Sequence, residues 1–314
     1  MKIVRRDPTM SPFKAATLGY FALVAIFVLL IFTLPGSKTT MAYYHLAPAS
    51  YHILYFLLTL PSMMVWAAAF YGYAKLQTYG QSINGTVEGD DFRLLGRGLA
   101  WLAWSLPVTA LTSVVLNAVA AASPGFHPAA IIIANYVALL LPLIGFSLVS
   151  RGARGLTEHA KTRFSWTSAQ WIILGFVAAG VLYCYLTFRH FNLSSLSSTN
   201  NPYHLPVWLM VLTVVIPYLY AWFVGLLATY EIGSFSQQIR GLLYRQALRL
   251  LSGGLVSVII SSIAIQYLLS ASPRHGFVVV DGRLLWINIF RIIGGIGYIM
   301  IAFGVSRLKR IEDI

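Results

Sequence analysis

The chain has 314 residues, of which 58% are hydrophobic and only 10% are charged, and its mean hydropathy is +0.74. Soluble globular domains lie far below this hydropathy, so the composition excludes a soluble protein and predicts an integral membrane protein. The formal net charge of +13 would suit a nucleic-acid-binding protein, but the positions of the basic residues point to membrane topology instead.

Apolar stretches long enough to cross a bilayer recur along the whole chain. A transmembrane helix needs about 20 consecutive, mostly apolar residues. Eight stretches qualify: residues 15–34, 53–74, 94–122, 129–150, 171–188, 205–230, 250–270 and 284–306. The sequence therefore predicts an all-α integral membrane protein with eight transmembrane helices.

The basic residues gather on one side of this predicted topology. When both termini are placed in the cytoplasm, most of the 22 lysines and arginines are cytoplasmic, and the outer loops hold Lys38, Arg189, Arg274 and Arg283. Cytoplasmic segments of membrane proteins are enriched in Lys and Arg. We therefore expect a multi-pass protein of the plasma membrane with both termini in the cytoplasm. Its partners would be the lipid bilayer and anionic lipids at the cytoplasmic face, with no nucleic acid.

The second half of the chain repeats the first at an offset of 156 residues, the separation of Pro61 from Pro217. Residues 61–101 align without gaps to 217–257, and VSR at 149–151 recurs at 305–307. Self-similarity at a fixed offset is typical of a duplicated unit. Because each unit has an even number of spans, both enter the membrane from the same side. The sequence thus predicts two tandem four-helix repeats in parallel orientation, related by a pseudo-two-fold axis along the membrane normal.

The repeat divides the chain into five segments. Residues 1–14 are a cytoplasmic N-terminus, 15–155 the first four-span repeat, 156–165 a cytoplasmic linker, 166–311 the second four-span repeat and 312–314 a cytoplasmic tail.

Each repeat is predicted to contain a long cytoplasmic connection, at residues 75–93 and 231–249. The second connection sets leucines among arginines, which is typical of a short amphipathic helix on the inner leaflet. Lys75 and Glu231 open the two connections at equivalent positions and carry opposite charges. They are candidates for an ion pair between the repeats; the alternative is that both snorkel at the surface.

Prolines near the middle of the second and sixth spans, Pro61 and Pro217, predict bends in both helices. Transporters place substrate sites at such irregular backbone near the bilayer midplane. The alternative is that the prolines only shape the packing, since proline is ordinary in membrane helices. Each proline has a threonine and a tryptophan nearby that would line the same path or act as packing anchors: Thr59, Thr213, Trp66 and Trp222.

Polar residues follow one face of the third and seventh spans, among them Ser105, Ser261 and Gln266. Such a face lines a polar path or allows close helix packing with hydrogen bonds between helices. Apart from Arg97, which lies at the cytoplasmic end of residues 94–122, Arg291 is the one lysine or arginine inside a predicted span. It is a candidate to contact an anion or a lipid head group, or it snorkels to the outer interface.

All but one of the seven histidines fall on the predicted outer side. Pseudo-symmetry would bring together His45, His127, His204 and His275 as metal ligands. No two of them have the spacing of ligands on one helix, and no acidic residues accompany them. Solvated loops are therefore the preferred interpretation, and we expect no metal or other cofactor.

No catalytic motif is present: the chain lacks GxSxG, HExxH and a phosphate loop ending in GK[ST]. The sequence therefore favours a non-enzymatic protein. The leading hypothesis is a permease-like or channel-like protein whose path lies between the two halves. The alternatives are a non-transporting scaffold or accessory subunit that packs against other membrane proteins or copies of itself, and a metal- or haem-binding protein that uses the outer histidines.

Overall fold

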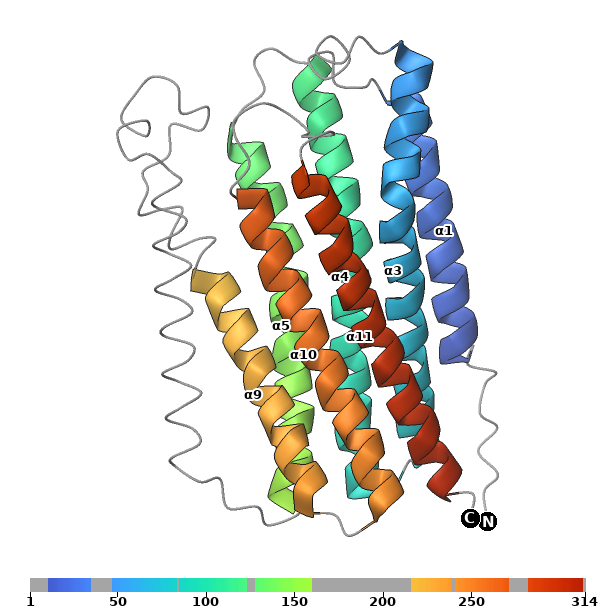
Figure 1. The fold of residues 1–314 in the computed structure, drawn as a ribbon, viewed down its shortest axis with the longest axis vertical. Coiled ribbons are helices and arrows are strands. Elements are labelled where there is room, and N and C mark those ends of the chain that lie inside the picture. Colours follow the sequence, from blue (N-terminus) through green and yellow to red (C-terminus); the bar gives the residue numbers. More distant parts are fainter. Residues whose placement is uncertain are drawn as a thin grey trace, which may run out of the picture.

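The computed structural model describes residues 11–34, 47–83, 85–122, 128–159, 216–238, 241–270 and 282–312. These residues form seven helices: α1 Pro12–Thr33, α3 Pro48–Ser82, α4 Val87–Ala122, α5 Pro128–His159, α9 Ile216–Gln238, α10 Leu242–Ser270 and α11 Gly282–Glu312. The helices lie side by side in one bundle (Figure 1). Every predicted span overlaps one of them except 171–188, which lies outside the described residues.

Five helices, α1, α3, α4, α10 and α11, contain segments long and apolar enough to cross a membrane. Many large apolar side chains are exposed on these helices, as lipid-facing surfaces require; examples are Phe21 of α1, Met64 of α3 and Phe303 of α11. The helical architecture is that of a polytopic membrane protein.

Six helices form a closed ring of pairwise contacts. α3 packs on α4, α4 on α5, α5 on α9, α9 on α10, α10 on α11, and α11 back on α3. α1 lies outside this ring against α3, with a smaller contact to α4 (Figure 1). The ring therefore brings the first and second halves of the chain together at two places, α5 with α9 and α11 with α3.

Prolines mark the start of several helices because proline fixes φ near its helical value and lacks an N–H that the first turn could not use. Pro12, Pro48 and Pro128 are the first residues of α1, α3 and α5, and Pro217 is the second residue of α9. In α1 the hydroxyl of Ser11 also accepts a hydrogen bond from the backbone N–H of Lys14 at 3.4 Å, as an N-cap does.

The surface helix predicted within residues 231–249 is wrong, and bundle helices occupy most of both predicted connections, 75–93 and 231–249. α3 continues to Ser82 and α4 begins at Val87, while α9 continues to Gln238 and α10 begins at Leu242. Residues 231–249 therefore belong to two bundle helices and not to one helix on the membrane surface. The reason is burial: large apolar side chains of both segments are fully enclosed between helices, which a bilayer surface would not achieve. They are Tyr79, Phe92, Ile232 and Leu248.

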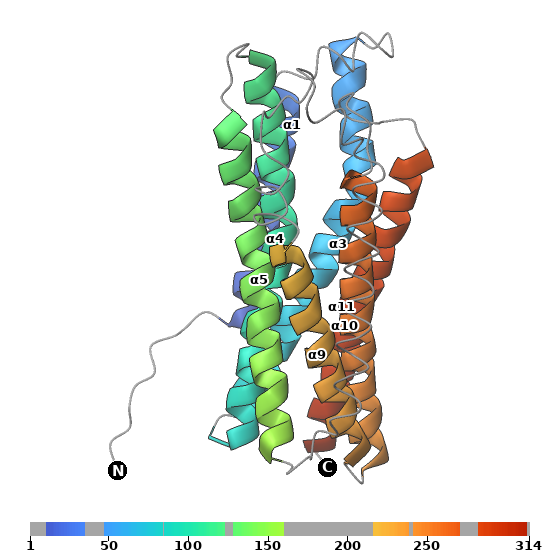
Figure 2. The same ribbon diagram turned by 90° about the vertical axis from the view of Figure 1, so that its left-hand side faces the viewer.

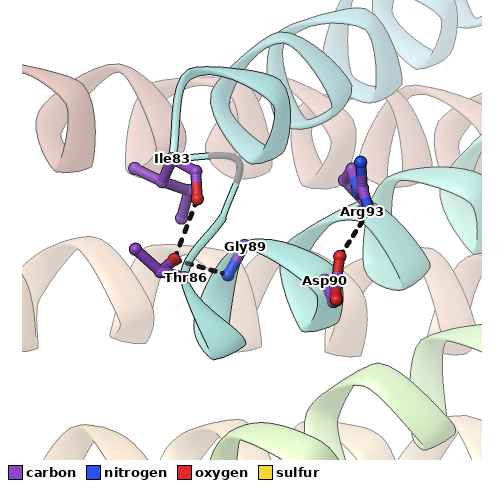
Figure 3. Close-up of polar contacts among 5 residues, drawn as sticks. All are labelled: Ile83, Thr86, Gly89, Asp90 and Arg93. Atoms are coloured by element: carbon purple, nitrogen blue, oxygen red, sulfur yellow. Dashed lines mark hydrogen bonds and ion pairs between the residues drawn. The ribbon is translucent and has the colours of Figure 1, made fainter. Parts of the chain in front are cut away.

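The short turn between α3 and α4 is closed by Thr86 (Figure 3). Its hydroxyl donates to the carbonyl oxygen of Ile83 at 2.9 Å and accepts from the N–H of Gly89 at 3.0 Å. The second bond makes Thr86 the N-cap of α4, because it satisfies a backbone N–H of the first turn that has no partner within the helix. Asp90 and Arg93 form an ion pair on the next turn, and the carboxylate suits the positive end of the helix dipole.

Glycines set the two most extensive helix contacts, α4 with α5 and α10 with α11. A Cβ on Gly98 would lie 2.6 Å from the carbonyl oxygen of Gly145, and a Cβ on Gly254 would lie 2.5 Å from that of Gly297. Small residues let membrane helices approach this closely. Any larger side chain at these positions would have to move a backbone.

Candidate functional site

Charged side chains divide the bundle into two unlike ends. Most described cations lie at the end that carries the α3–α4 turn, which is the end where the N- and C-termini lie in Figure 1. We call this the basic end; its cations include Lys75, Arg93, Arg97, Arg151, Arg154, Arg245, Arg249 and Arg307. The acids whose side chains are described, Glu88, Asp90, Asp91 and Glu231, lie at the same end. Among the described side chains, Arg291 is the one cation in the opposite half.

Arg291 lies on α11 where that helix meets α3. Its Nη1 donates to the amide oxygen of Asn288 at 3.3 Å, and the hydroxyl of Tyr55 on α3 is close enough to interact with it electrostatically. The Tyr55 ring stacks on that of Tyr51, with centroids 6.0 Å apart and planes 9° from parallel. We call these four residues the Arg291 cluster. It places a cation, an amide and two phenols on one contact between the two halves.

The cluster has an electrostatic cost that the described chain does not offset with a carboxylate. A charged side chain at the centre of a membrane helix costs about 2.5–3.5 kcal/mol on insertion scales, and one nearer the end of a span, as Arg291 is, costs less. The described carboxylates are at the basic end, and Asp281, the acid nearest to Arg291 in the sequence, lies outside the described residues. Position inside a span made Arg291 a candidate in the sequence, but its tyrosine neighbours come from a helix distant in sequence.

The predicted path residues of the second span lie in α3, with Pro61 in the helix interior. The hydroxyl of Thr59 donates to the carbonyl oxygen of Phe56 at 2.8 Å within the same helix. Trp66 is buried against Phe27 of α1 in an edge-to-face contact, with centroids 5.2 Å apart. Trp66 therefore contacts the helix outside the ring, as the packing-anchor interpretation requires.

The matching residues of the sixth span are partly described. The indole N–H of Trp222 on α9 donates to the hydroxyl of Ser262 on α10 at 3.3 Å. Pro217 stands at the beginning of α9, while Thr213 and the side chain of Gln266 lie outside the described part of the chain. Trp222 thus joins two neighbouring helices of the second half.

The serines of the predicted polar face are engaged in helix packing. Ser105 donates to the carbonyl oxygen of Leu102 in its own helix at 2.6 Å. Ser261 of α10 donates to the carbonyl oxygen of Phe290 on α11, also at 2.6 Å, and Gly294 leaves room for that hydroxyl. The Ser261 bond joins α10 to α11, as the packing alternative expects, whereas the Ser105 bond stays within α4.

Glu231 forms its ion pair with Arg154. The side chain of Glu231 is 8% exposed, and its Oε1 lies 3.5 Å from Nε of Arg154 across the contact between α5 and α9. Lys75 places its ammonium group 5.4 Å from the ring centroid of Tyr71 on its own helix. An ion pair does join the two halves, but its cation comes from α5. The sequence alone did not indicate Arg154 as the partner of Glu231.

This ion pair should couple the stability effects of its two residues. We expect Arg154→Gln to lower the free energy of unfolding by about 1–2 kcal/mol, because it leaves a buried carboxylate beside a neutral side chain, with the cost reduced by the exposure of Arg154. Thermal unfolding of Arg154→Gln, Glu231→Gln and the double variant in detergent measures the coupling. The matched control is Arg151→Gln, an exposed arginine one turn earlier on α5. Strictly additive effects would contradict the pairing.

The candidate metal ligands His45, His127, His204 and His275 all lie outside the described residues. Within the described residues, no group of three or more His, Cys, Asp or Glu side chains could hold a metal ion.

No family model matches the chain, and neither a curated protein nor a solved structure matches it. Its helices identify it by class, as an α-helical, polytopic membrane protein.

Proposed function

We propose that the protein is a permease-like or channel-like membrane protein whose path runs between two duplicated halves. The observation that carries the proposal is the ring of six helices. Its contacts follow the same order in each half: α3, α4 and α5 pack in sequence, then α9, α10 and α11, and each set meets the other at both ends. Two copies of a three-helix unit around a pseudo-two-fold axis would produce this order, and transporters built from repeats bind substrate between them.

Glycine contacts support the duplication. Gly98 of α4 meets Gly145 of α5, and Gly254 of α10 meets Gly297 of α11, each pair through a carbonyl oxygen. The α4 and α10 glycines are 156 residues apart, the offset found in the sequence. The α5 and α11 glycines are 152 residues apart, which is shorter by about one helical turn.

A second set of contacts has the same two offsets. Gly152 of α5 lies against Leu95 of α4, and Gly304 of α11 lies against Leu251 of α10. The two glycines are 152 residues apart in the sequence, and the two leucines are 156 residues apart. The VSR strings at 149–151 and 305–307 are 156 residues apart, so they do not occupy equivalent positions in the helix contacts of α5 and α11 but differ by about one helical turn. A loss of four residues from the second copy, between α10 and the glycines of α11, accounts for both offsets.

The course of α3 changes its neighbours along the bundle and brings it to the second half away from the basic end. Figure 2 shows α3 beside α4 near the basic end and beside α11 toward the opposite end. The contacts agree, because Gly80 lies against Arg93 of α4 whereas Val65 lies against Gly295 of α11. Pro61 lies inside α3 just beyond Val65, and proline in a helix interior favours a bend there. The Arg291 cluster lies on the far side of Pro61 from Val65.

The basic end belongs in the cytoplasm in this proposal. Its arginines follow the rule that Lys and Arg flank membrane spans on the cytoplasmic side. Their exposed side chains also support the proposed association with anionic lipids of the plasma membrane. The exposed arginines include Arg97, Arg151, Arg154, Arg249 and Arg307.

Two neighbouring positions of α3 test whether water enters between the halves. Ser62 is 8% exposed and Met64 is 73% exposed on the lipid-facing side. Cys184 would be replaced by Ser, and Ser62→Cys and Met64→Cys each probed in membranes with an impermeant thiol reagent. We expect Ser62→Cys to be labelled and Met64→Cys to stay unlabelled, because lipid excludes the reagent.

Protection of both cysteines would overturn the path and favour the second candidate, a non-transporting scaffold or accessory subunit. The specific observation behind that candidate is the use of polar groups to join helices, as in the bonds of Ser261 to Phe290 and of Trp222 to Ser262. A dry, packed ring would leave its outer apolar faces for other membrane proteins or for a second copy.

A further inference from the structure

We infer that the Arg291 cluster binds one phosphate-type oxyanion, supplied either by a free solute or by the head group of a phospholipid. The inference names the ligand at the outer end of the proposed path and to that extent rests on the proposed function. Binding itself, however, needs only the contact between α3 and α11.

The donors of the cluster suit a tetrahedral oxyanion. A guanidinium has five N–H donors in a planar fork that fits phosphate oxygens, and the acceptor that the described residues give Arg291 is the neutral amide oxygen of Asn288 at 3.3 Å. The Tyr55 hydroxyl, on another helix, interacts electrostatically with the same guanidinium. A phosphate group can accept from the guanidinium fork and from a phenol at once, and it offers more acceptor oxygens than a carboxylate does.

A bound anion beside Arg291 would stabilise its positive charge. A guanidinium stays protonated in proteins, and its interactions strengthen away from water. The described acids lie at the basic end of the bundle. An anion bound beside Arg291 would therefore remove much of the cost of a charge within a span.

The site should occur once per chain. The glycine contacts align α11 with α5 at a separation of 152 residues, and the position that this gives for Arg291 in α5 is Leu139. The contact between α5 and α9, which joins the halves on the other side of the ring, has no cation at that position. We expect one equivalent of ligand and not two.

The test uses the purified full-length chain and has two arms. Equilibrium dialysis with radiolabelled inorganic phosphate measures binding of a free oxyanion, and native mass spectrometry after incubation with phosphatidylglycerol detects a bound lipid. We expect one equivalent in at least one arm, and the arm that responds identifies the source. Arg291→Gln should weaken that binding by roughly 10-fold or more, and Tyr55→Phe by a smaller factor, since a hydrogen bond to a charged group is worth about 1.5–3 kcal/mol.

The matched control is Arg307→Gln, which removes the same charge from the exposed basic end of the same helix and should leave binding unchanged. No binding in either arm, or binding that Arg291→Gln and Tyr55→Phe both leave intact, overturns the inference. Equal loss in Arg307→Gln would show a general effect of charge and also overturns it. If Arg291→Gln does not fold, Tyr55→Phe decides, because it keeps the ring and the stacking on Tyr51. Labelling of Ser62→Cys without phosphate binding would leave the path standing and remove only this ligand.

Discussion

Gly254→Ala is expected to destabilise the protein strongly, whereas Gly253→Ala on the same helix is expected to have little effect. The two glycines are neighbours in α10 but face different surroundings. A Cβ on Gly254 would lie 2.5 Å from the carbonyl oxygen of Gly297, which is backbone of α11. A Cβ on Gly253 would meet only the terminal methyl of Met300, at 3.2 Å, and a flexible methionine can move away.

The expected sizes follow from these neighbours. Overpacking against a backbone that must shift costs about 1–3 kcal/mol, and Gly254→Ala should lie at the upper end. Gly253→Ala should be neutral or stabilise by up to about 1 kcal/mol, because alanine favours the helix more than glycine does. Thermal unfolding in a mild detergent, followed by circular dichroism, compares the two. Equal midpoints would show that α10 and α11 do not approach as closely as the structure has them.

The same experiment on Gly98 examines the proposed duplication. Gly98→Ala places a Cβ 2.6 Å from the carbonyl oxygen of Gly145, so its destabilisation should match that of Gly254→Ala. A neutral Gly98→Ala beside a damaging Gly254→Ala would mean that the two contacts are not equivalent.

Gly155→Ala is the second substitution from which we expect a large loss of stability. A Cβ at this position would lie 2.1 Å from Oδ1 of Asp91 and 2.5 Å from its Cγ. Asp91 is 8% exposed, so its carboxylate has little solvent to move into and would give up buried interactions. We expect a cost of about 2–3 kcal/mol, as for other strained or polar core positions.

A double variant separates this clash from a general effect of alanine. Asp91→Ala alone should cost about 1–2 kcal/mol for the lost carboxylate interactions. The variant with both substitutions should be more stable than the sum predicts, because removing the carboxylate removes the clash. Gly233→Ala is the matched control, since its nearest neighbour, the Ser252 hydroxyl, is 3.6 Å away. Additive losses would place Asp91 elsewhere.

The sequence by itself determined the class of the protein and the course of its helices. Apolar composition is a property of each segment alone, and a span needs a fixed length of it, so seven predicted spans could be located before any packing was known. It also contained the signal for the short turn after α3. Asn84 and Gly85 form a turn dipeptide, Thr86 is a favourable N-cap, and Gly85 has a φ of 100°. The prediction of a long connection did not use this signal.

Only the tertiary structure decided which side chains meet. It paired Glu231 with Arg154, brought Tyr55 to Arg291, and shifted the register of α11 against α5 by one turn relative to the VSR match. Helices in lipid gain little by hiding apolar surface from one another, because lipid tails are as apolar as leucine. Their contacts depend instead on the close fit of small residues such as Gly98 and Gly254 and on hydrogen bonds between helices. That fit belongs to pairs of helices distant in sequence, which the hydropathy of a single segment does not contain.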